Sequence, residues 1–431
     1  MELSFWAATD VGRKREANED NFLVDKKLSL FVVADGMGGH ASGEVASDIS
    51  VHEFRNAIDA NREIIERYTK GDVEVRPQDI LTVLEHALQT ACHAIYERGQ
   101  AEPEKRGMGT TTSALLIAGD RGFIAHVGDS RIYLVRRGQV VQLTEDHSLI
   151  NELIRRGKIT KEGIDSSPYK SYKNAVTRAV GVYETVQTDT IDFEILPGDQ
   201  FLLCSDGLHA YLTDEKTIAL LSGEDITSAP NRFVALANEG GGHDNITAVV
   251  VRVDRTAAGA AATAADDRAD ELQRKVDVLK QMPLFRHLTY REIIRVLNVT
   301  EVKEFAPGVD IIKEGTFGEE LYILLKGKVR VHKNDAFITY LLPGSHIGEM
   351  ALVDRIPRSA SATAEDPSRL LILRRREFYE IVRKDPSLSV KLLWSFVQVL
   401  AERLRKTTAE LSGARLEAHA QDLTDDVLFD E

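Results

Sequence analysis

The stretch Leu28-Ser-Leu-Phe-Val-Val-Ala-Asp-Gly-Met-Gly-Gly-His40 decides the fold of the N-terminal half of this chain. Its apolar run, residues 30–34, is long enough for a buried strand and too short for a helix. The run ends on Asp35-Gly36, which puts a carboxylate at the mouth of a buried strand, beside glycines that let a ligand approach the backbone. An isolated Asp-Gly is more often a solvated turn. A functional role for Asp35 therefore becomes the better interpretation only if other aspartates lie at strand ends in the same way.

The same situation recurs at three other aspartates. Asp206 follows the apolar run 201–204, Asp129 follows His126-Val-Gly, and Asp244 precedes the apolar run 246–251. Four carboxylates at strand ends are expected to meet at one mouth of a sandwich, where they repel one another unless cations lie between them. Ligands that are all oxygen, without a His/Cys pattern, favour Mg²⁺ or Mn²⁺ over zinc.

Composition limits the class of protein. The 431 residues are 43% hydrophobic and 28% charged, which predicts two or three core-forming domains. A net charge of −14 argues against a nucleic-acid-binding surface. Cys92 and Cys204 are too few for a disulfide framework and are expected to be buried. The N-terminus does not resemble a signal peptide and no apolar run reaches membrane-spanning length, so we expect a cytoplasmic protein that contacts no membrane.

Residues 1–254 are predicted to be one α+β domain. Helical spacing runs through 46–65 and 77–98, and short stretches rich in β-branched and aromatic residues predict strands at 31–34, 112–117, 122–127, 132–136, 200–204 and 246–253. Runs of strands with helix pairs between them indicate a layered sandwich and not a parallel βαβ sheet.

The composition then changes. Residues 255–282 combine an alanine-rich linker with a connecting helix at 268–281. Residues 283–413 predict a second domain, with a helix at 290–297, short strands with turn glycines typical of a β-roll or jelly roll, and a long helix opened by Asp385-Pro386. The acidic tail, residues 414–431, is expected to be disordered.

Six collinear motifs in residues 1–254 resemble the bacterial PPM-type metal-dependent Ser/Thr protein phosphatases. They are Arg15-Glu-Ala-Asn-Glu-Asp20, Asp35-Gly-Met-Gly-Gly-His40, Gly109-Thr-Thr111, Gly128-Asp-Ser-Arg131, Ser205-Asp-Gly207 and Asp244-Asn245. The resemblance implies a four-layer αββα sandwich and hydrolysis of phosphoserine and phosphothreonine in proteins, which would include substrates of a bacterial Ser/Thr kinase.

The resemblance also assigns roles. Asp35 would bridge two Mn²⁺ or Mg²⁺ ions, with the Gly36 carbonyl on the second; Asp206 and Asp244 would complete the ligands of the first. Asp129 would hold a third, weaker ion. Glu19, Asp20 and Asn245 would support metal-bound waters, and Arg15 would clamp the phosphate. A hydroxide bridging the metals would attack phosphorus, so no Ser or Cys nucleophile is expected.

Two features of this half stay open. The proton for the leaving group could come from His40 or from a water on the third metal. Residues 146–173 contain Ser166-Ser-Pro168 and take the place of the flap that shapes substrate access in the family; alternatively they are a surface insertion without that role.

The second domain carries a contiguous cassette, residues 348–361, with Glu349 and Arg358 in one loop-plus-short-helix unit. An acid for a ribose hydroxyl, with an arginine and free N–H groups for a phosphate, makes a nucleotide cradle, although an exposed Glu–Arg ion pair is the commoner meaning of such a pair.

Residues 283–411 resemble cyclic-nucleotide-binding domains. The resemblance implies that Glu349 takes the ribose 2′-hydroxyl, that Arg358 and Ser359 take the cyclic phosphate, and that Gly348, Met350 and Ala351 offer backbone groups. A serine after the arginine, here Ser359, occurs in cAMP binders of the family, so the resemblance mildly favours cAMP, although a hydroxyl at this position also suits cGMP.

The long helix carries a heptad seam of Leu393, Val397, Leu400, Leu404, Thr407 and Leu411, which would either join two copies as a homodimer or cover the β-roll of its own chain. The sequence thus predicts a Mg²⁺/Mn²⁺-dependent phosphatase regulated by a cyclic nucleotide. Two rivals remain: a phosphatase whose second domain is a ligand-free docking or dimerisation scaffold, and a module that binds phosphoproteins without turnover.

Overall fold

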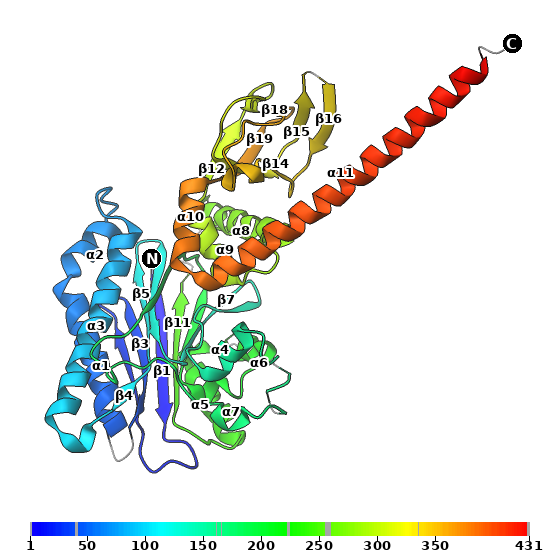
Figure 1. Ribbon diagram of the computed structural model, residues 1–431. Helices are drawn as coiled ribbons and strands as arrows, with labels where there is room; N and C mark the ends of the chain where they lie inside the picture. Colours follow the sequence, from blue (N-terminus) through cyan, green and yellow to red (C-terminus); the bar gives the residue numbers. More distant parts are fainter. Residues whose placement is uncertain are drawn as a thin grey trace. The chain divides into compact units, whose positions relative to one another are not determined.

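The computed structural model describes residues 2–38, 42–160, 162–164, 166–221, 225–254, 260–334 and 336–428. The chain divides into two compact units, Met1–Ala269 and Asp270–Glu431. Figure 1 shows the elements of both units.

The first unit is built on two antiparallel sheets. One has the order β1 (Leu3–Asp10), β11 (Ile246–Val253), β10 (Gln200–Cys204), β7 (Arg131–Arg136) and β8 (Gln139–Gln142). The other has the order β2 (Asp20–Asp25), β3 (Leu30–Met37), β5 (Thr112–Ala118), β6 (Arg121–Val127) and β9 (Asp189–Glu194), with β4 (Gly109–Thr110) paired to β3.

The two sheets pack face to face between two layers of helices (Figure 1). Aromatic pairs join the sheets, with ring centroids 5.6 Å apart for Phe5 and Phe31 and 5.8 Å for Phe193 and Phe201. The helices α1 (Ser42–Ala60), α2 (Arg62–Thr69) and α3 (Pro77–Ala101) cover the β3 sheet, and α5 (Asp206–His209), α6 (Asp214–Leu221) and α7 (Ala229–Glu239) cover the other. The predicted αββα sandwich is confirmed.

Local pattern anticipated the buried strands better than the half-buried ones. The predicted strands 200–204 and 246–253 coincide with β10 and β11, because their side chains are nearly all buried. The strands β1, β2 and β9 were missed, since each is only partly buried and mixes polar with apolar residues.

The predicted helix 46–65 is wrong as a single element. Two helices, α1 and α2, meet at Asn61. The Asn61 side-chain amide donates to the carbonyl of Ala57 at 2.8 Å, and its backbone N–H donates to the carbonyl of Ile58 at 3.1 Å. Such a local side-chain bond competes with the helical ladder and ends α1.

The second unit contains a β-roll of two four-stranded antiparallel sheets around an apolar core. One sheet is ordered β12 (Glu301–Phe305), β19 (Ser368–Arg374), β14 (Glu320–Lys326) and β17 (His346–Ile347); the other is β13 (Asp310–Ile312), β18 (Ser361–Ala364), β15 (Val329–Lys333) and β16 (Ala336–Leu341). Around it lie α8 (Ala260–Gln281), which includes the expected connecting helix, α9 (Tyr290–Leu297), α10 (Arg375–Lys384) and α11 (Pro386–Leu428).

The C-terminal helix confirms one expectation and corrects another. Asp385 Oδ1 accepts from the N–H groups of Ser387 and Leu388 at 3.0 Å each, so it caps α11. The disorder expected after Arg415 is wrong as far as residue 428, because α11 runs to Leu428. Residues 416–428 contain no Gly or Pro and include Leu, Ala, Glu and Gln, which favour helix despite the acidic charge.

The linker residues 255–259 lie outside the described residues. In the part of the chain that the structure describes, no helix has both the length and the apolarity that crossing a bilayer requires. Cys92 and Cys204 are buried free thiols, as expected.

Candidate metal centre and nucleotide pocket

The predicted carboxylates come from the ends of both sheets of the first unit. Asp20 opens β2 and lies directly opposite Asp35 on β3. Asp206 opens α5 immediately after β10, and Asp244 lies two residues before β11. Asp129 lies in the turn between β6 and β7. The face-to-face packing of the sheets is what brings these separate segments to one place.

Asp20 shows how the site holds a carboxylate in the absence of a counter-charge. The hydroxyls of Ser205 and Thr247 each donate to Asp20 Oδ2 at 2.7 Å, while Oδ1 is buried and has no hydrogen-bond partner among the described residues. Burial raises the pKa of Asp20 to about 7, with smaller contributions from the charges of Asp206 and Asp244.

Asp35 is held mainly through its backbone. Its N–H donates to Thr111 Oγ1 at 2.9 Å, and its carbonyl accepts from the Thr111 N–H and the Thr110 hydroxyl at 2.8 Å each. Burial raises the pKa of the Asp35 carboxyl well above its ordinary value, and the charges of Asp20, Asp206, Asp129 and Asp244 add to the shift. The repulsion predicted from the sequence is therefore present.

Gly36 can only be glycine here. A Cβ atom at this position would collide with the carbonyl oxygen of Gly43, and it would lie 2.6 Å from that of Glu19. The close approach keeps the backbone of Gly36 next to the carboxylates.

Asp206 and Asp129 complete the group. Burial raises the pKa of Asp206 to about 6 and that of Asp129 to about 7, with the charge of a neighbouring aspartate second in each case. Asp206 Oδ1 is buried without a hydrogen-bond partner in the described structure. The Asp129 carbonyl is 3.0 Å from His209 Nε2. Since burial lowers the pKa of His209 to about 3, the ring is neutral and carries its proton on Nε2.

These residues fit a hydrated divalent cation. No three His, Cys, Asp or Glu side chains of the described residues are already arranged as a group that could hold an ion. Mg²⁺-like ions, however, keep several waters and take only one or two carboxylates each. The buried, unpartnered oxygens of Asp20 and Asp206 and the mutually raised pKa values are what such ions would relieve.

The loop before β2 carries two more predicted residues, Arg15 and Glu19. Arg15 Nη2 lies 2.8 Å from Asp244 Oδ2, and the arginine side chain is 48% exposed. Asn245 Oδ1 accepts from the Glu19 N–H at 2.8 Å, and its amide donates to the carbonyls of Val11 and Ala17 at 3.0 and 2.9 Å. Asn245 therefore shapes the loop that presents Arg15 and Glu19.

His40 lies outside the described residues. Sequence reasoning assigned no role to Thr111, Ser205, Thr247 or His209. Thr111 and Ser205 belong to motifs that were recognised, so a signal existed for them. No local pattern pointed to Thr247 or His209, because each acts through a long-range contact.

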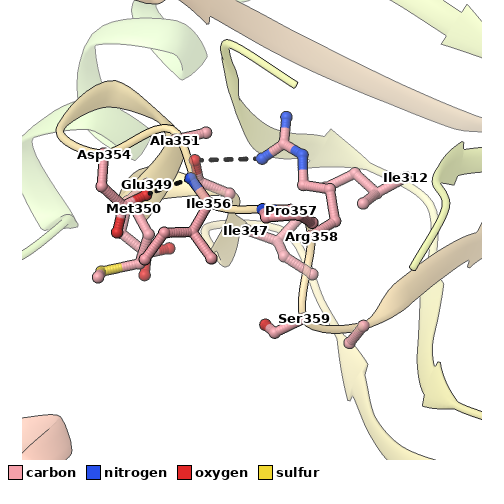
Figure 2. Close-up of a pocket in the computed structure, with 12 residues that line it drawn as sticks. Ile312, Ile347, Glu349, Met350, Ala351, Asp354, Ile356, Pro357, Arg358 and Ser359 are labelled. Atoms are coloured by element: carbon pink, nitrogen blue, oxygen red, sulfur yellow. Dashed lines mark hydrogen bonds between the residues drawn. The ribbon is translucent and has the colours of Figure 1, made fainter. Parts of the chain in front are cut away.

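In the second unit, the cassette predicted from sequence lines one pocket of about 270 Å³ (Figure 2). This volume is near the lower end for small-molecule sites. All six predicted residues line this pocket: Gly348, Glu349, Met350, Ala351, Arg358 and Ser359. The other lining residues are Ile312, Ile347, Asp354, Ile356, Pro357 and Ala360. Glu349 is buried, and Met350 is 42% exposed.

Contacts within the protein hold the Arg358 side chain in place. Its side chain is only 8% exposed, and Nη2 donates to the Glu320 carbonyl at 2.9 Å and to Glu320 Oε2 at 3.3 Å. Nη1 donates to the Gly348 carbonyl at 3.4 Å (Figure 2). Gly348 has φ of +87°, and a Cβ there would lie 2.5 Å from Arg358 Nη1. Glycine at 348 thus makes room for the guanidinium.

The short helix of the cassette is anchored from both sides. The Ala351 N–H donates to the Gly348 carbonyl at 3.0 Å, and the Ala351 carbonyl accepts from Arg375 Nε at 2.6 Å. Arg375 also donates to the Asp354 carbonyl. Both backbone groups of Ala351 are therefore engaged by the protein itself.

Two family models match the chain. The protein phosphatase 2C model matches residues 12–232, and the cyclic nucleotide-binding domain model matches residues 302–385. The chain is 34% identical over 298 residues to the serine/threonine protein phosphatase PstP of Mycobacterium tuberculosis, which is 65% of this chain and 54% of that protein, so it spans about half the length of that relative.

A second relative is covered almost completely. The serine/threonine phosphatase stp of Listeria monocytogenes is 38% identical over 255 residues, which is 58% of this chain and 96% of that protein. A crystal structure of PstP from M. tuberculosis and a crystal structure of the catalytic domain of PstP with two manganese ions match with TM-scores of 0.51 and 0.50 at 34% identity, covering 59% of this chain and 99% of each solved chain.

Proposed function

The chain belongs to the protein phosphatase 2C family, and we propose that it hydrolyses phosphoserine and phosphothreonine in proteins. The reaction would use two or three Mn²⁺ or Mg²⁺ ions. Binding of a cyclic nucleotide, preferentially cAMP, to the second unit would regulate its rate. The proposed phosphatase activity rests on the buried aspartates at the sheet ends. Their pKa values are raised by burial and by one another's charges, and some of their oxygens have no hydrogen-bond partner in the described structure. Its phosphoprotein substrates would be products of a Ser/Thr kinase in the cytoplasm.

The carboxylates are proposed as the metal-binding residues. Asp35 and the Gly36 carbonyl would serve two ions, Asp206 and Asp244 the first, and Asp129 a third. When bound, the ions would lower the pKa of a water to the range in which it can act as a nucleophile. Glu19 and Asp20 would order water at the site, and one oxygen of Asp20 is held by the hydroxyls of Ser205 and Thr247.

Arg15 is proposed to bind the substrate phosphate. It is half exposed on the loop held by Asn245 and ion-pairs with Asp244 at 2.8 Å. A guanidinium in this position can turn from a carboxylate to a phosphate oxygen, because it carries more donors than Asp244 uses. The proton for the leaving alkoxide is assigned to His40 or to a water held at Asp129; a variant His40→Gln distinguishes them through the basic limb of the pH–rate profile.

The proposed binding of a cyclic nucleotide rests on Glu349 and Arg358, whose buried side chains line the same pocket. Glu349 would accept from the ribose 2′-hydroxyl, and Arg358, with the Ser359 hydroxyl, would bind the cyclic phosphate. Backbone groups of Gly348 and Met350 would border the ligand. Within the described residues, the hydrogen bonds of the Arg358 guanidinium come from Nη1 and Nη2, which leaves the Nε–H for a phosphate oxygen.

The test of the combined function is the initial rate of phosphate release from a phosphothreonine peptide with Mn²⁺, measured with and without cAMP. A rate that changes on saturation with cAMP supports both halves and their coupling. An unchanged rate with cAMP and cGMP, together with no binding heat, supports the rival in which the second domain is a ligand-free scaffold. No turnover in any condition supports the phosphoprotein-binding rival.

A homodimer through α11 is a second proposal. One face of the helix, including Leu388, Leu392 and Val399, is buried within its own unit, while another row is exposed: Val390, Leu393, Trp394, Val397, Leu404 and Leu411. The row extends the predicted seam toward its N-terminal end, whereas Leu400 is partly buried. Sedimentation of the full chain should give a dimer that Leu404→Glu with Leu411→Glu converts to a monomer; a wild-type monomer would refute it.

A further inference from the structure

Two buried histidines lie behind the turn that carries Asp129, and neither is assigned a part in the proposed reaction. His126 belongs to β6, and His147 lies between β8 and α4 (Leu149–Arg155). Their ring centroids are 4.9 Å apart. Burying an imidazole is costly unless it finds hydrogen-bond partners, so the partners of these two rings indicate what the rings hold in place.

His147 holds the peptide that leads into Asp129. The Gly128 N–H donates to His147 Nδ1 at 3.1 Å, and the His147 N–H donates to the Gly128 carbonyl at 2.7 Å. Gly128 has φ of +108°, and a Cβ atom there would lie 2.5 Å from the Thr111 side chain, so this conformation requires glycine. The N–H and the carbonyl of Gly128 are therefore both bonded to one histidine.

The contact with Gly128 also assigns the proton of the His147 ring. A neutral imidazole accepts through one nitrogen and donates through the other. Because the Gly128 N–H belongs to the backbone and cannot turn away, Nδ1 is the acceptor and Nε2 carries the proton. Nε2 faces Asp189 Oδ2 at 3.6 Å. Arg178 Nη1 lies 3.1 Å from Nε2, but this side chain can turn and donates to Asp189 Oδ1 at 3.1 Å.

Two more contacts hold the segment that carries His147 against the same turn. Arg131, at the start of β7, donates from Nε and Nη2 to the Asp146 carboxylate at 2.9 and 2.6 Å. From β6, His126 Nε2 donates to the Glu145 carbonyl at 3.0 Å, since a carbonyl can only accept. The segment is thus fixed on both sides of the turn, which allows His147 to act as a rigid support.

We propose that His147 is a positioning residue for Asp129: through Nδ1 and Gly128 it sets the direction in which the Asp129 carboxylate meets a divalent cation. His209 Nε2 holds the Asp129 carbonyl at 3.0 Å, so histidines hold the backbone on both sides of this aspartate. This role presupposes the proposed function, and it concerns the third, weaker ion and not the pair of ions at Asp35. Loss of a group that orients a metal ligand from behind typically lowers metal affinity about ten- to a hundredfold.

Two amide variants separate the two edges of the ring. In His147→Asn, Oδ1 is bonded to Cγ as Nδ1 is, so an acceptor for the Gly128 N–H is kept; in His147→Gln the amide lies one bond further out, toward Asp189. Binding of Mn²⁺ to the full chain is measured by titration calorimetry. His147→Gln should weaken the weakest class of Mn²⁺ site about tenfold, whereas His147→Asn should stay within about threefold of wild type. The tighter sites should keep their affinity in both variants, which a general loss of structure would not allow.

Asp129→Asn is the reference variant, because it removes the charge of the proposed ligand itself. Adding His147→Gln to it should bring no further loss of Mn²⁺ affinity, since His147 acts through Asp129. An additive loss in the double variant would overturn the proposal. Unchanged affinity in His147→Gln, or an equal loss in both amide variants, would also overturn it.

Thermal unfolding with chelator shows whether each variant is folded. If His147→Gln gives no cooperative transition, Asp189→Asn takes its place, because it keeps the ring and loosens its orientation; an unchanged weakest site would then overturn the proposal. A wild type that binds no Mn²⁺ would refute the proposed metal centre and this role with it. Mn²⁺ binding without the expected differences between the variants would refute the role of His147 alone.

Discussion

The carboxylate site of the first unit and the pocket of the second are opposite solutions to holding charge. The first concentrates like charges: Asp20, Asp35, Asp129 and Asp206 all have raised pKa values because they are buried together. The second holds one buried cation, Arg358, against the carboxylate and carbonyl of Glu320. The first site is electrostatically incomplete, whereas the arginine of the second has a counter-charge before any ligand arrives.

The difference teaches which part of each site is preorganised. At the pocket, ligand binding exchanges or adds hydrogen bonds around a guanidinium whose position is already set by Glu320 and Gly348. At the carboxylates, the backbone is held in place but the aspartates have no cation to balance their charge. Binding of metal ions should therefore change the protonation of the aspartates and the stability of the first unit. The predictions below test that contrast.

The largest effect is expected at Asp35. Asp35→Asn keeps the shape of the side chain but removes the charge shared by the two proposed ions, so turnover of a phosphothreonine peptide should fall about a thousandfold or more. Mn²⁺ binding measured by calorimetry should weaken in parallel, while cAMP binding to the second unit should not change. Activity within tenfold of wild type would remove Asp35 from the metal centre.

The next effect is expected at Arg358. Arg358→Ala should weaken cAMP binding about a hundredfold, because a charge-assisted contact to the cyclic phosphate is lost. Arg358→Lys should recover little of it, since a lysine cannot reproduce the fork held by Glu320. Basal phosphatase activity without nucleotide serves as the control. If calorimetry finds equal affinity in wild type and Arg358→Ala, the phosphate does not bind at this arginine.

The third prediction concerns pH. A carboxyl whose pKa rises from 3.8 to about 7 on folding, as at Asp20 and Asp129, binds its proton more tightly in the folded protein. Between pH 4 and 7 the folded state therefore holds more protons than the unfolded state, so the stability of the metal-free protein should fall as the pH rises through that window. At about 1.4 kcal/mol for each pH unit and each such group, we expect a loss of several kcal/mol and a clear fall in Tm for the first unit.

Saturating Mn²⁺ should flatten this pH dependence, because the ions supply the charge that the protons supplied. Calorimetric scans at pH 5 and pH 7, with chelator and with Mn²⁺, provide the measurement. If the unfolding temperature of the first unit in the metal-free protein rose from pH 5 to pH 7, the proposed effect of the buried carboxyls on stability would be contradicted. The transition of the second unit is the internal reference.

The smallest effect is expected at Thr111. Thr111→Val removes the hydroxyl that accepts the Asp35 N–H at 2.9 Å and contacts Ser130 Oγ at 2.7 Å, with little change in volume. We expect about 1 kcal/mol of destabilisation and about fivefold lower activity. Thr111→Ser keeps the hydroxyl and should stay near wild type. Equal loss in both variants would mean that the methyl group matters and the hydroxyl does not.

The sequence by itself determined a good deal of this protein. The apolar runs 30–34, 200–204 and 246–253 marked buried strands because full burial imposes continuous hydrophobicity. The nucleotide cassette was readable as a unit because the six predicted residues lie within residues 348–359, and local turns bring them to one pocket. The cap at Asp385 followed from local chemistry in the same way.

Tertiary structure alone decided the rest. The partners of Asp20 come from the residue that follows β10 and from β11, more than 180 residues away, and the contact of His209 with Asp129 joins the end of α5 to the turn between β6 and β7. No local pattern encodes such pairs, because they exist only once the two sheets pack together. The burial that raises the carboxylate pKa values is likewise a property of the assembled sandwich. Residue type and spacing name the candidates, but packing decides which of them share charge.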